Sequence, residues 1–161
     1  MMKEVQAVTY VNYFLTQLAG EVGFVSLGLG KDFKKYSIAG MYGVVPAEVA
    51  GDHSIETVTM RQTYTFFQGN RLSFHGGLNI FHVLGLSYQT TKFRDSPKAY
   101  YPIGSIRGLL NLGLTLRMRK ERSFYFESGM NDIWITNWIT NSSVVDPVDH
   151  LSLALGFKQS F

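Results

Sequence analysis

Residues 103–118 read IGSIRGLLNLGLTLRM, and this stretch decides the fold. Every second position on one side of it is apolar, with a single interruption at Gly108: Ile106, Leu110, Leu112, Leu114, Leu116 and Met118. The other side is mostly small or polar: Ser105, Arg107, Leu109, Asn111, Gly113, Thr115 and Arg117. A period of two predicts a β-strand with one apolar face, because on an α-helix the same leucines would be scattered around the axis.

The same alternation extends along the chain. The further segments that show it are residues 22–30, 36–45, 55–67, 72–86, 123–138 and 151–161. Residues 5–18 are interpreted as the first strand, although their dense apolar residues also fit a short helix or a buried strand. A chain of 161 residues has the size of one domain. The sequence therefore predicts a single domain over residues 1–161, an all-β, eight-stranded antiparallel up-and-down barrel.

The breaks between these segments alternate in length. Residues 31–35, 68–70 and 119–122 form short breaks, whereas residues 46–54, 87–102 and 140–149 form long ones. Bacterial outer-membrane barrels have an even number of strands, short periplasmic turns and long extracellular loops. The pattern predicts a transmembrane barrel with both termini in the periplasm. The break at residues 19–22 departs from it, since it is short where a long loop is expected.

Composition narrows the function classes. There is no cysteine, which excludes disulfides and thiolate metal sites. The net charge of +3 is mild and, apart from Arg117, Arg119, Lys120 and Arg122, the basic residues are scattered, so a nucleic-acid partner is not expected. His53, His75, His82 and His150 lack the spacing of zinc ligands, so no metal and no cofactor is predicted.

Aromatic residues flank the breaks, as Tyr and Trp do at a membrane interface. Those beside the long breaks are Tyr100, Tyr101, Trp134 and Trp138, and those beside the short breaks are Phe66, Phe67, Phe124 and Tyr125. The aromatic fraction is 14%, and this joint distribution, rather than any single ring, favours a membrane barrel.

The face predicted to point inward carries an interior charge network. Its ionisable members are Arg61, His75, Arg107, Arg117, Glu127 and Lys158. Glu127 is expected opposite Thr115 on the neighbouring strand and within salt-bridge reach of Arg117 or Lys158. A proton or ion pathway is one interpretation. A buried network that plugs the lumen is preferred, because the interior of an eight-stranded barrel is just wide enough for its own side chains.

The C-terminal stretch LSLALGFKQSF, residues 151–161, resembles the last strand of bacterial outer-membrane β-barrel proteins. In that group a final aromatic residue, here Phe161, is part of the signal that the barrel assembly machinery reads. Gln159 departs from the pattern, which prefers an apolar residue there. The resemblance implies a Gram-negative cell envelope, outer-membrane lipid and lipopolysaccharide as surroundings, the assembly machinery as a partner, and extracellular loops that could contact another protein. A soluble lipocalin-like carrier remains an alternative.

A second resemblance concerns one long break. Phe93-Arg94-Asp95-Ser96, followed by Tyr101-Pro102-Ile103-Gly104, resembles a segment of the lipid A palmitoyltransferase family, which are outer-membrane enzymes. The resemblance implies that Asp95 and Ser96 are catalytic, with His53 in the adjacent long break as their partner. Asp-Ser before Pro97 is also ordinary turn chemistry. A non-enzymatic barrel is therefore preferred, and a lipid A-modifying enzyme stays open.

Overall fold

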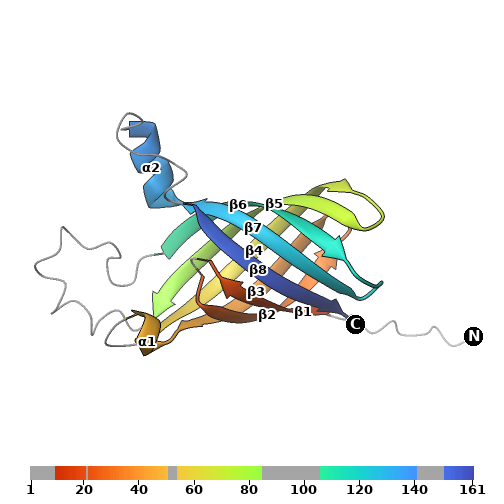
Figure 1. The fold of residues 1–161 in the computed structure, drawn as a ribbon, viewed down its shortest axis with the longest axis horizontal. Coiled ribbons are helices and arrows are strands. Elements are labelled where there is room, and N and C mark those ends of the chain that lie inside the picture. The colour runs from red at the N-terminus through yellow and green to blue at the C-terminus, as the bar shows by residue number, and fades with distance from the viewer. Residues whose placement is uncertain (1–9, 21, 51–53, 85–105, 141–150) are drawn as a thin grey trace, which may run out of the picture.

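The structure is a computed structural model that describes residues 10–20, 22–50, 54–84, 106–140 and 151–161. These ranges contain eight strands: β1 (Tyr13–Ala19), β2 (Val25–Phe33), β3 (Tyr36–Val45), β4 (Ile55–Gln68), β5 (Leu72–Leu84), β6 (Ile106–Arg117), β7 (Arg122–Asn131) and β8 (Ser152–Ser160). Each pairs antiparallel with its neighbours in sequence, and β8 pairs with β1 to close the barrel (Figure 1). The predicted eight-stranded up-and-down barrel is confirmed.

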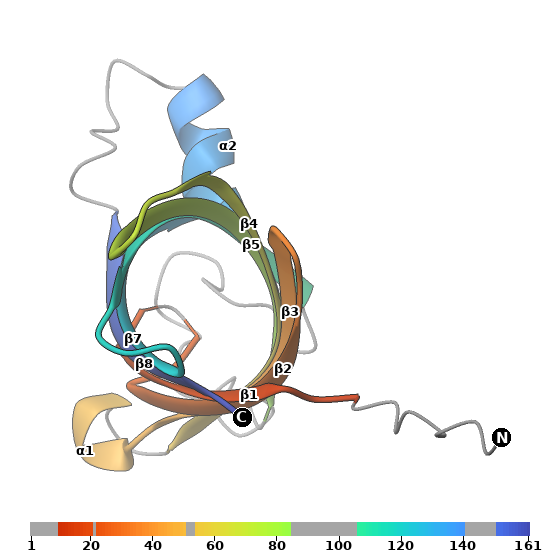
Figure 2. The same ribbon diagram turned by 90° about the vertical axis from the view of Figure 1, so that its right-hand side faces the viewer.

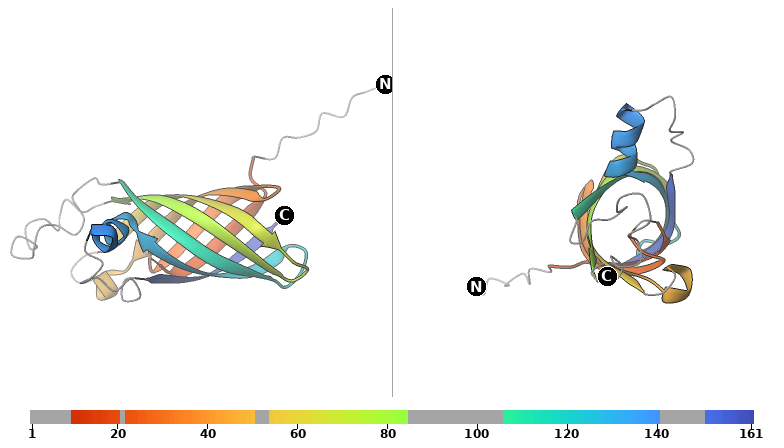
Figure 3. Two further views of the ribbon diagram at one scale, coloured as in Figure 1. Left: turned by 90° about the horizontal axis from the view of Figure 1, so that it is seen from above. Right: turned by 90° about the vertical axis from the view of Figure 1, so that its left-hand side faces the viewer.

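The two ends of the barrel differ. One end holds the tight connections at residues 34–35, 69–71 and 118–121 together with the start of β1 and the end of β8, and we call it the turn end (Figures 1 and 3). The opposite end, the loop end, holds the helices α1 (Ala47–Ala50) and α2 (Asp132–Thr140). The alternation of short and long connections that the sequence predicted therefore separates the two ends of the molecule.

Several predicted strand boundaries need correction; among them, the strand expected over residues 22–30 is β2 at Val25–Phe33. The first strand was expected over residues 5–18; β1 is a strand, not a helix, and it spans Tyr13–Ala19, while residues 5–9 lie outside the described ranges. The strand expected over residues 123–138 ends at Asn131 and continues as α2. The Asn131 side chain accepts a hydrogen bond from the Trp134 backbone N–H at 3.0 Å. This N-cap supplies a partner that the first helical turn otherwise lacks, and so it starts the helix where alternation alone predicted more strand.

The outer surface of the barrel is apolar along most of its length. Leu110 and Leu112 on β6 are 55% and 66% exposed, and exposed apolar residues also lie on each of the remaining strands. Among them are Leu18, Leu27, Leu29, Ile38, Val58, Met60, Leu78, Phe126, Leu153 and Leu155. The alternate positions point into the barrel, and many are buried and polar: Gln17, Ser26, Thr57, Thr59, Arg61, His75, Asn79, Asn111 and Glu127.

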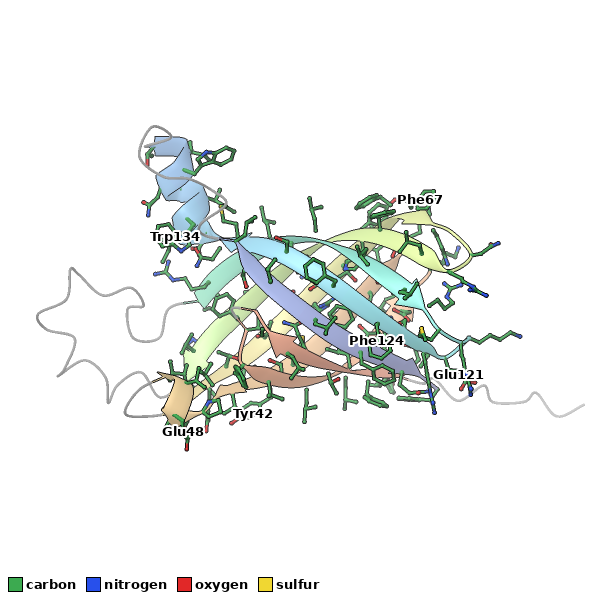
Figure 4. The ribbon with its side chains drawn as sticks, in the orientation of Figure 1. Tyr42, Glu48, Phe67, Glu121, Phe124 and Trp134 are labelled. Carbon is green, nitrogen blue, oxygen red and sulfur yellow. The ribbon has the colours of Figure 1, made fainter. Side chains whose placement is uncertain are left out.

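Aromatic rings gather on the outer surface toward the turn end. Tyr36 packs on Tyr64 with ring centroids 4.7 Å apart, and Phe124 packs on Phe157 at 5.3 Å. Figure 4 shows Phe67 on the outside of the barrel near this end. A register irregularity between Thr65 and Phe67 lets Phe66 and Phe67 both lie exposed, as a β-bulge allows.

Tyr125 does not belong to this outer group. It was expected to flank a turn as an interface residue, but it points inward and is 3% exposed. At the loop end Trp134 and Trp138 lie on α2, which projects sideways from the barrel (Figures 2 and 4). Tyr100 and Tyr101 lie outside the described residues. In the part of the chain that the structure describes, no helix is long and apolar enough to cross a membrane.

Candidate functional site

The carboxylate of Glu127 is the centre of the polar interior. Arg61 approaches it with both terminal guanidinium nitrogens, Nη2 at 2.5 Å from Oε1 and Nη1 at 2.9 Å from Oε2. His75 Nε2 lies 2.7 Å from Oε1, and Asn111 donates from Nδ2 to Oε2 at 3.3 Å. A carboxylate only accepts hydrogen bonds, so His75 donates from Nε2. We call these four residues the charge layer.

Strand register explains how the charge layer forms. Glu127 on β7 lies opposite Gly113 on β6, which in turn lies opposite His75 on β5. A Cβ atom at Gly113 would come within 2.6 Å of His75 Nε2 and 2.7 Å of Glu127 Cγ, well inside van der Waals contact. The glycine therefore leaves the gap through which two side chains meet across an intervening strand.

Arg61 reaches the layer from β4 and is held by further contacts. Its guanidinium lies over the Tyr125 ring at 4.6 Å from the centroid, within the range of a cation–π interaction. Gln17 Oε1 accepts from Arg61 Nη1 at 3.4 Å and from the Tyr125 hydroxyl at 3.2 Å. Gly156 makes space for the ring, since a Cβ atom there would lie 2.0 Å from Tyr125 Cζ. A buried bidentate pair with these extra partners is a rigid structural unit.

The sequence prediction joined the correct acid to the wrong bases. Glu127 pairs with Arg61 and His75. The predicted partners were Arg117 or Lys158, so this part of the prediction is wrong. The predicted register placed Glu127 opposite Thr115, whereas Thr115 lies opposite Tyr125. An error of two residues keeps each side chain on its predicted face but moves it by about 7 Å along the strand, which is enough to exchange one partner for another.

The remaining members of the predicted network lie elsewhere in the barrel. Lys158 Nζ lies 2.6 Å from Asp32 Oδ1 and over the Tyr13 ring. Arg107 pairs with Asp132 at 3.3 Å toward the loop end. Arg117 is exposed at the turn end. Asp32 was missed because it was placed in the break at residues 31–35, although β2 continues to Phe33 and its alternation points Asp32 inward.

An apolar cluster closes the barrel between the charge layer and the loop end. Val22, Phe81, Val83 and Leu109 pack together inside the barrel, and Ile55 packs against them. Val22 belongs to the short connection between β1 and β2, and its carbonyl accepts hydrogen bonds from the hydroxyls of Ser26 and Thr57. This connection is the one that departed from the predicted loop pattern. It folds into the loop end of the barrel, where Val22 packs in the apolar cluster.

Two cavities lie on either side of the charge layer. The one toward the loop end has a volume of about 10 Å³, close to the minimum that one water molecule needs. The other has a volume of about 270 Å³ and is open toward the turn end, and we call it the turn-end cavity. Figure 2 looks onto the barrel from this end. Arg61, His75 and Tyr125 form part of its lining.

The three residues proposed for catalysis cannot be placed. His53, Asp95 and Ser96 all lie outside the described residues, so the arrangement that the second resemblance implies stays a prediction. Within the described ranges, no group of three or more His, Asp or Glu side chains is arranged to hold a metal ion.

Comparison with known proteins gives no family. No model of a known protein family matches the chain, and a search of curated proteins found no relative.

Proposed function

We propose that this chain is an integral outer-membrane β-barrel with a plugged interior, which serves as a structural element of the envelope or contacts a partner through its loop end. The observation that carries the proposal is the distribution of side chains across the barrel wall. Leucine, phenylalanine and other apolar residues cover the outside, while Arg61, His75 and Glu127 are buried inside.

Water and lipid favour opposite distributions of apolar and polar side chains between the outside and the inside of a barrel. A soluble protein rarely exposes a continuous apolar surface of more than a few hundred square ångströms. A membrane barrel needs an apolar band on its outer surface and tolerates charge in its lumen. Leu110 lies opposite Leu78 and Leu114 lies opposite Phe126 in the strand register, so the apolar surface extends from β5 through β7. This arrangement argues for a bilayer as the surrounding medium.

A lipocalin-like carrier would need the reverse arrangement, with an apolar cavity and a polar outer wall. The turn-end cavity is lined mainly by polar and charged side chains. The lipocalin alternative is therefore disfavoured.

The aromatic rings near the turn end support the same proposal, because such rings favour the interface between hydrocarbon and headgroups. In the proposed orientation the turn end faces the periplasm, and β8 with the exposed Phe161 is the strand offered to the barrel assembly machinery. The Phe161 backbone N–H bonds to the Asn12 carbonyl at 3.0 Å, which extends the pairing of β8 with β1 by one residue.

The proposal is tested by the solubility of the folded chain. We expect the purified protein to aggregate without detergent and to be monodisperse in a mild detergent, with its strand content intact by circular dichroism. A monodisperse, folded monomer in detergent-free buffer would contradict the membrane placement.

A further inference from the structure

The turn-end cavity has a strongly basic lining. Among the described residues that line it are eight Lys or Arg side chains but only two carboxylates, Asp32 and Glu121. Two of the cations are already neutralised, Arg61 by Glu127 and Lys158 by Asp32. The others stand around the opening, and we call them the rim cations: Lys34, Lys35, Arg117, Arg119, Lys120 and Arg122.

The rim cations have no counter-ion among the residues that the structure describes. In the described part of the chain no carboxylate forms an ion pair with any of them, and Arg122 bonds to the neutral amide of Gln159 at 2.8 Å. All six are exposed, so the cost of keeping them charged is small. Like charges held around one opening repel each other, and a ligand of opposite charge relieves that repulsion.

The depth of the cavity distinguishes it from a charged surface. It reaches from the rim into the barrel as far as Arg61, His75 and Tyr125, and its volume is about 270 Å³. Hydroxyl groups from Ser37, Thr63, Thr65, Ser73, Thr115 and Ser123 line its wall. Arginine and lysine supply charge-assisted hydrogen bonds, and hydroxyls supply additional donors, which together suit phosphate oxygens.

We propose that the turn-end cavity binds a compact, water-soluble anion that carries two or more phosphate groups. The ligand enters from the turn end and stops at the charge layer, because the apolar cluster around Val22 and Phe81 closes the barrel beyond it. A phosphate attached to acyl chains is not the expected ligand, since the lining belongs to the inside of the barrel and the barrel wall separates it from the apolar outer surface. The site is one for binding and not for passage.

The test is isothermal titration calorimetry with inorganic pyrophosphate, in the medium that keeps the full chain monodisperse. We expect one pyrophosphate per chain, with an affinity that falls as salt is raised. The double variant Arg117→Gln with Arg119→Gln should bind about tenfold more weakly or worse, because each arginine contributes a charge-assisted hydrogen bond. Both side chains are exposed and outside any described ion pair, so the variant should unfold at the same denaturant concentration as the parent.

Arg71 provides a matched control. It is an exposed arginine in a turn at the same end of the barrel, but it does not line the cavity. Arg71→Gln should change the affinity by less than about twofold, as expected for a screened surface charge. The control removes one charge and the double variant removes two, so a free-energy loss in the control of half that in the double variant or more would overturn the proposal, because it would reflect net charge alone. Absence of binding at millimolar pyrophosphate would also overturn it, as would Arg117-dependent binding confined to phosphatidic acid in micelles.

Discussion

At Glu127, a guanidinium, an imidazole and an amide converge on one carboxylate inside a narrow barrel. Charges removed from water are costly unless they are paired and hydrogen-bonded, and here Arg61 uses two nitrogens for the pair. The pair therefore constrains which side chains the interior tolerates, because loss of either partner leaves the other as a buried, uncompensated charge.

Glu127→Gln should therefore destabilise the barrel by about 3–5 kcal/mol, the usual cost of removing one member of a buried ion pair. Urea unfolding of the refolded protein measures this loss in the free energy of unfolding. The matched control is Glu121→Gln at the exposed turn end, which should have little effect. Combining Glu127→Gln with Arg61→Met should recover part of the loss, because no charge then stays unpaired. Equal stability of Glu127→Gln and its parent would contradict the structural role.

Gly113→Ala tests the gap between His75 and Glu127. The added methyl group would meet both side chains, so we expect a loss of about 1–3 kcal/mol, typical of overpacking. Gly108→Ala, on the same strand, is the control, since a Cβ atom there has no neighbour within 4 Å. The same unfolding experiment compares them. The account is wrong if the two alanine variants lose equal stability.

Among the elements, α2 shows how a local signal can end a strand. The Asn131 side chain caps α2 by accepting a hydrogen bond from the Trp134 backbone N–H, directly after the end of β7. Asn131→Ala should destabilise the helix by about 1 kcal/mol. Hydrogen exchange should then be faster for the α2 amides than in the parent. Asn137→Ala on the same helix, where no described side-chain hydrogen bond is lost, should leave the exchange close to that of the parent; equal acceleration by both would argue against the cap.

The elements also show what sequence patterning can predict. Because a buried polar interior and an apolar exterior force inward and outward positions to differ, period-two alternation was enough to find the strands from β2 to β8 and to assign their faces, but not their ends. Register was predicted less well, since the turn after β6 could not be placed to within one residue, and the partners of Glu127 changed with it. The inward fold of Val22 had no signal in the alternation, because it depends on contacts with Phe81 and Leu109 from distant strands.

The whole molecule has three layers along the barrel axis: an open basic cavity, the charge layer, and the apolar cluster around Val22. In the described residues, the charge layer and the apolar cluster leave no continuous water-filled path, because the cavity between them has a volume of about 10 Å³. We therefore expect no steady conductance when the protein is reconstituted in planar bilayers. Reproducible single-channel steps from the pure protein would contradict a plugged interior.

The central claim is that the apolar outer face lies in lipid, and the absence of cysteine makes one measurement especially direct. A single Cys placed at Leu112 and carrying a nitroxide label reports on its surroundings after reconstitution into liposomes. We expect high collision rates with oxygen and low rates with a water-soluble nickel complex, because Leu112 is 66% exposed on that face. A label at Ser73, in the lining of the turn-end cavity, should show the opposite preference. If the nickel complex reaches the label at residue 112 as readily as the label at residue 73, the outer face is in water and the membrane placement is wrong.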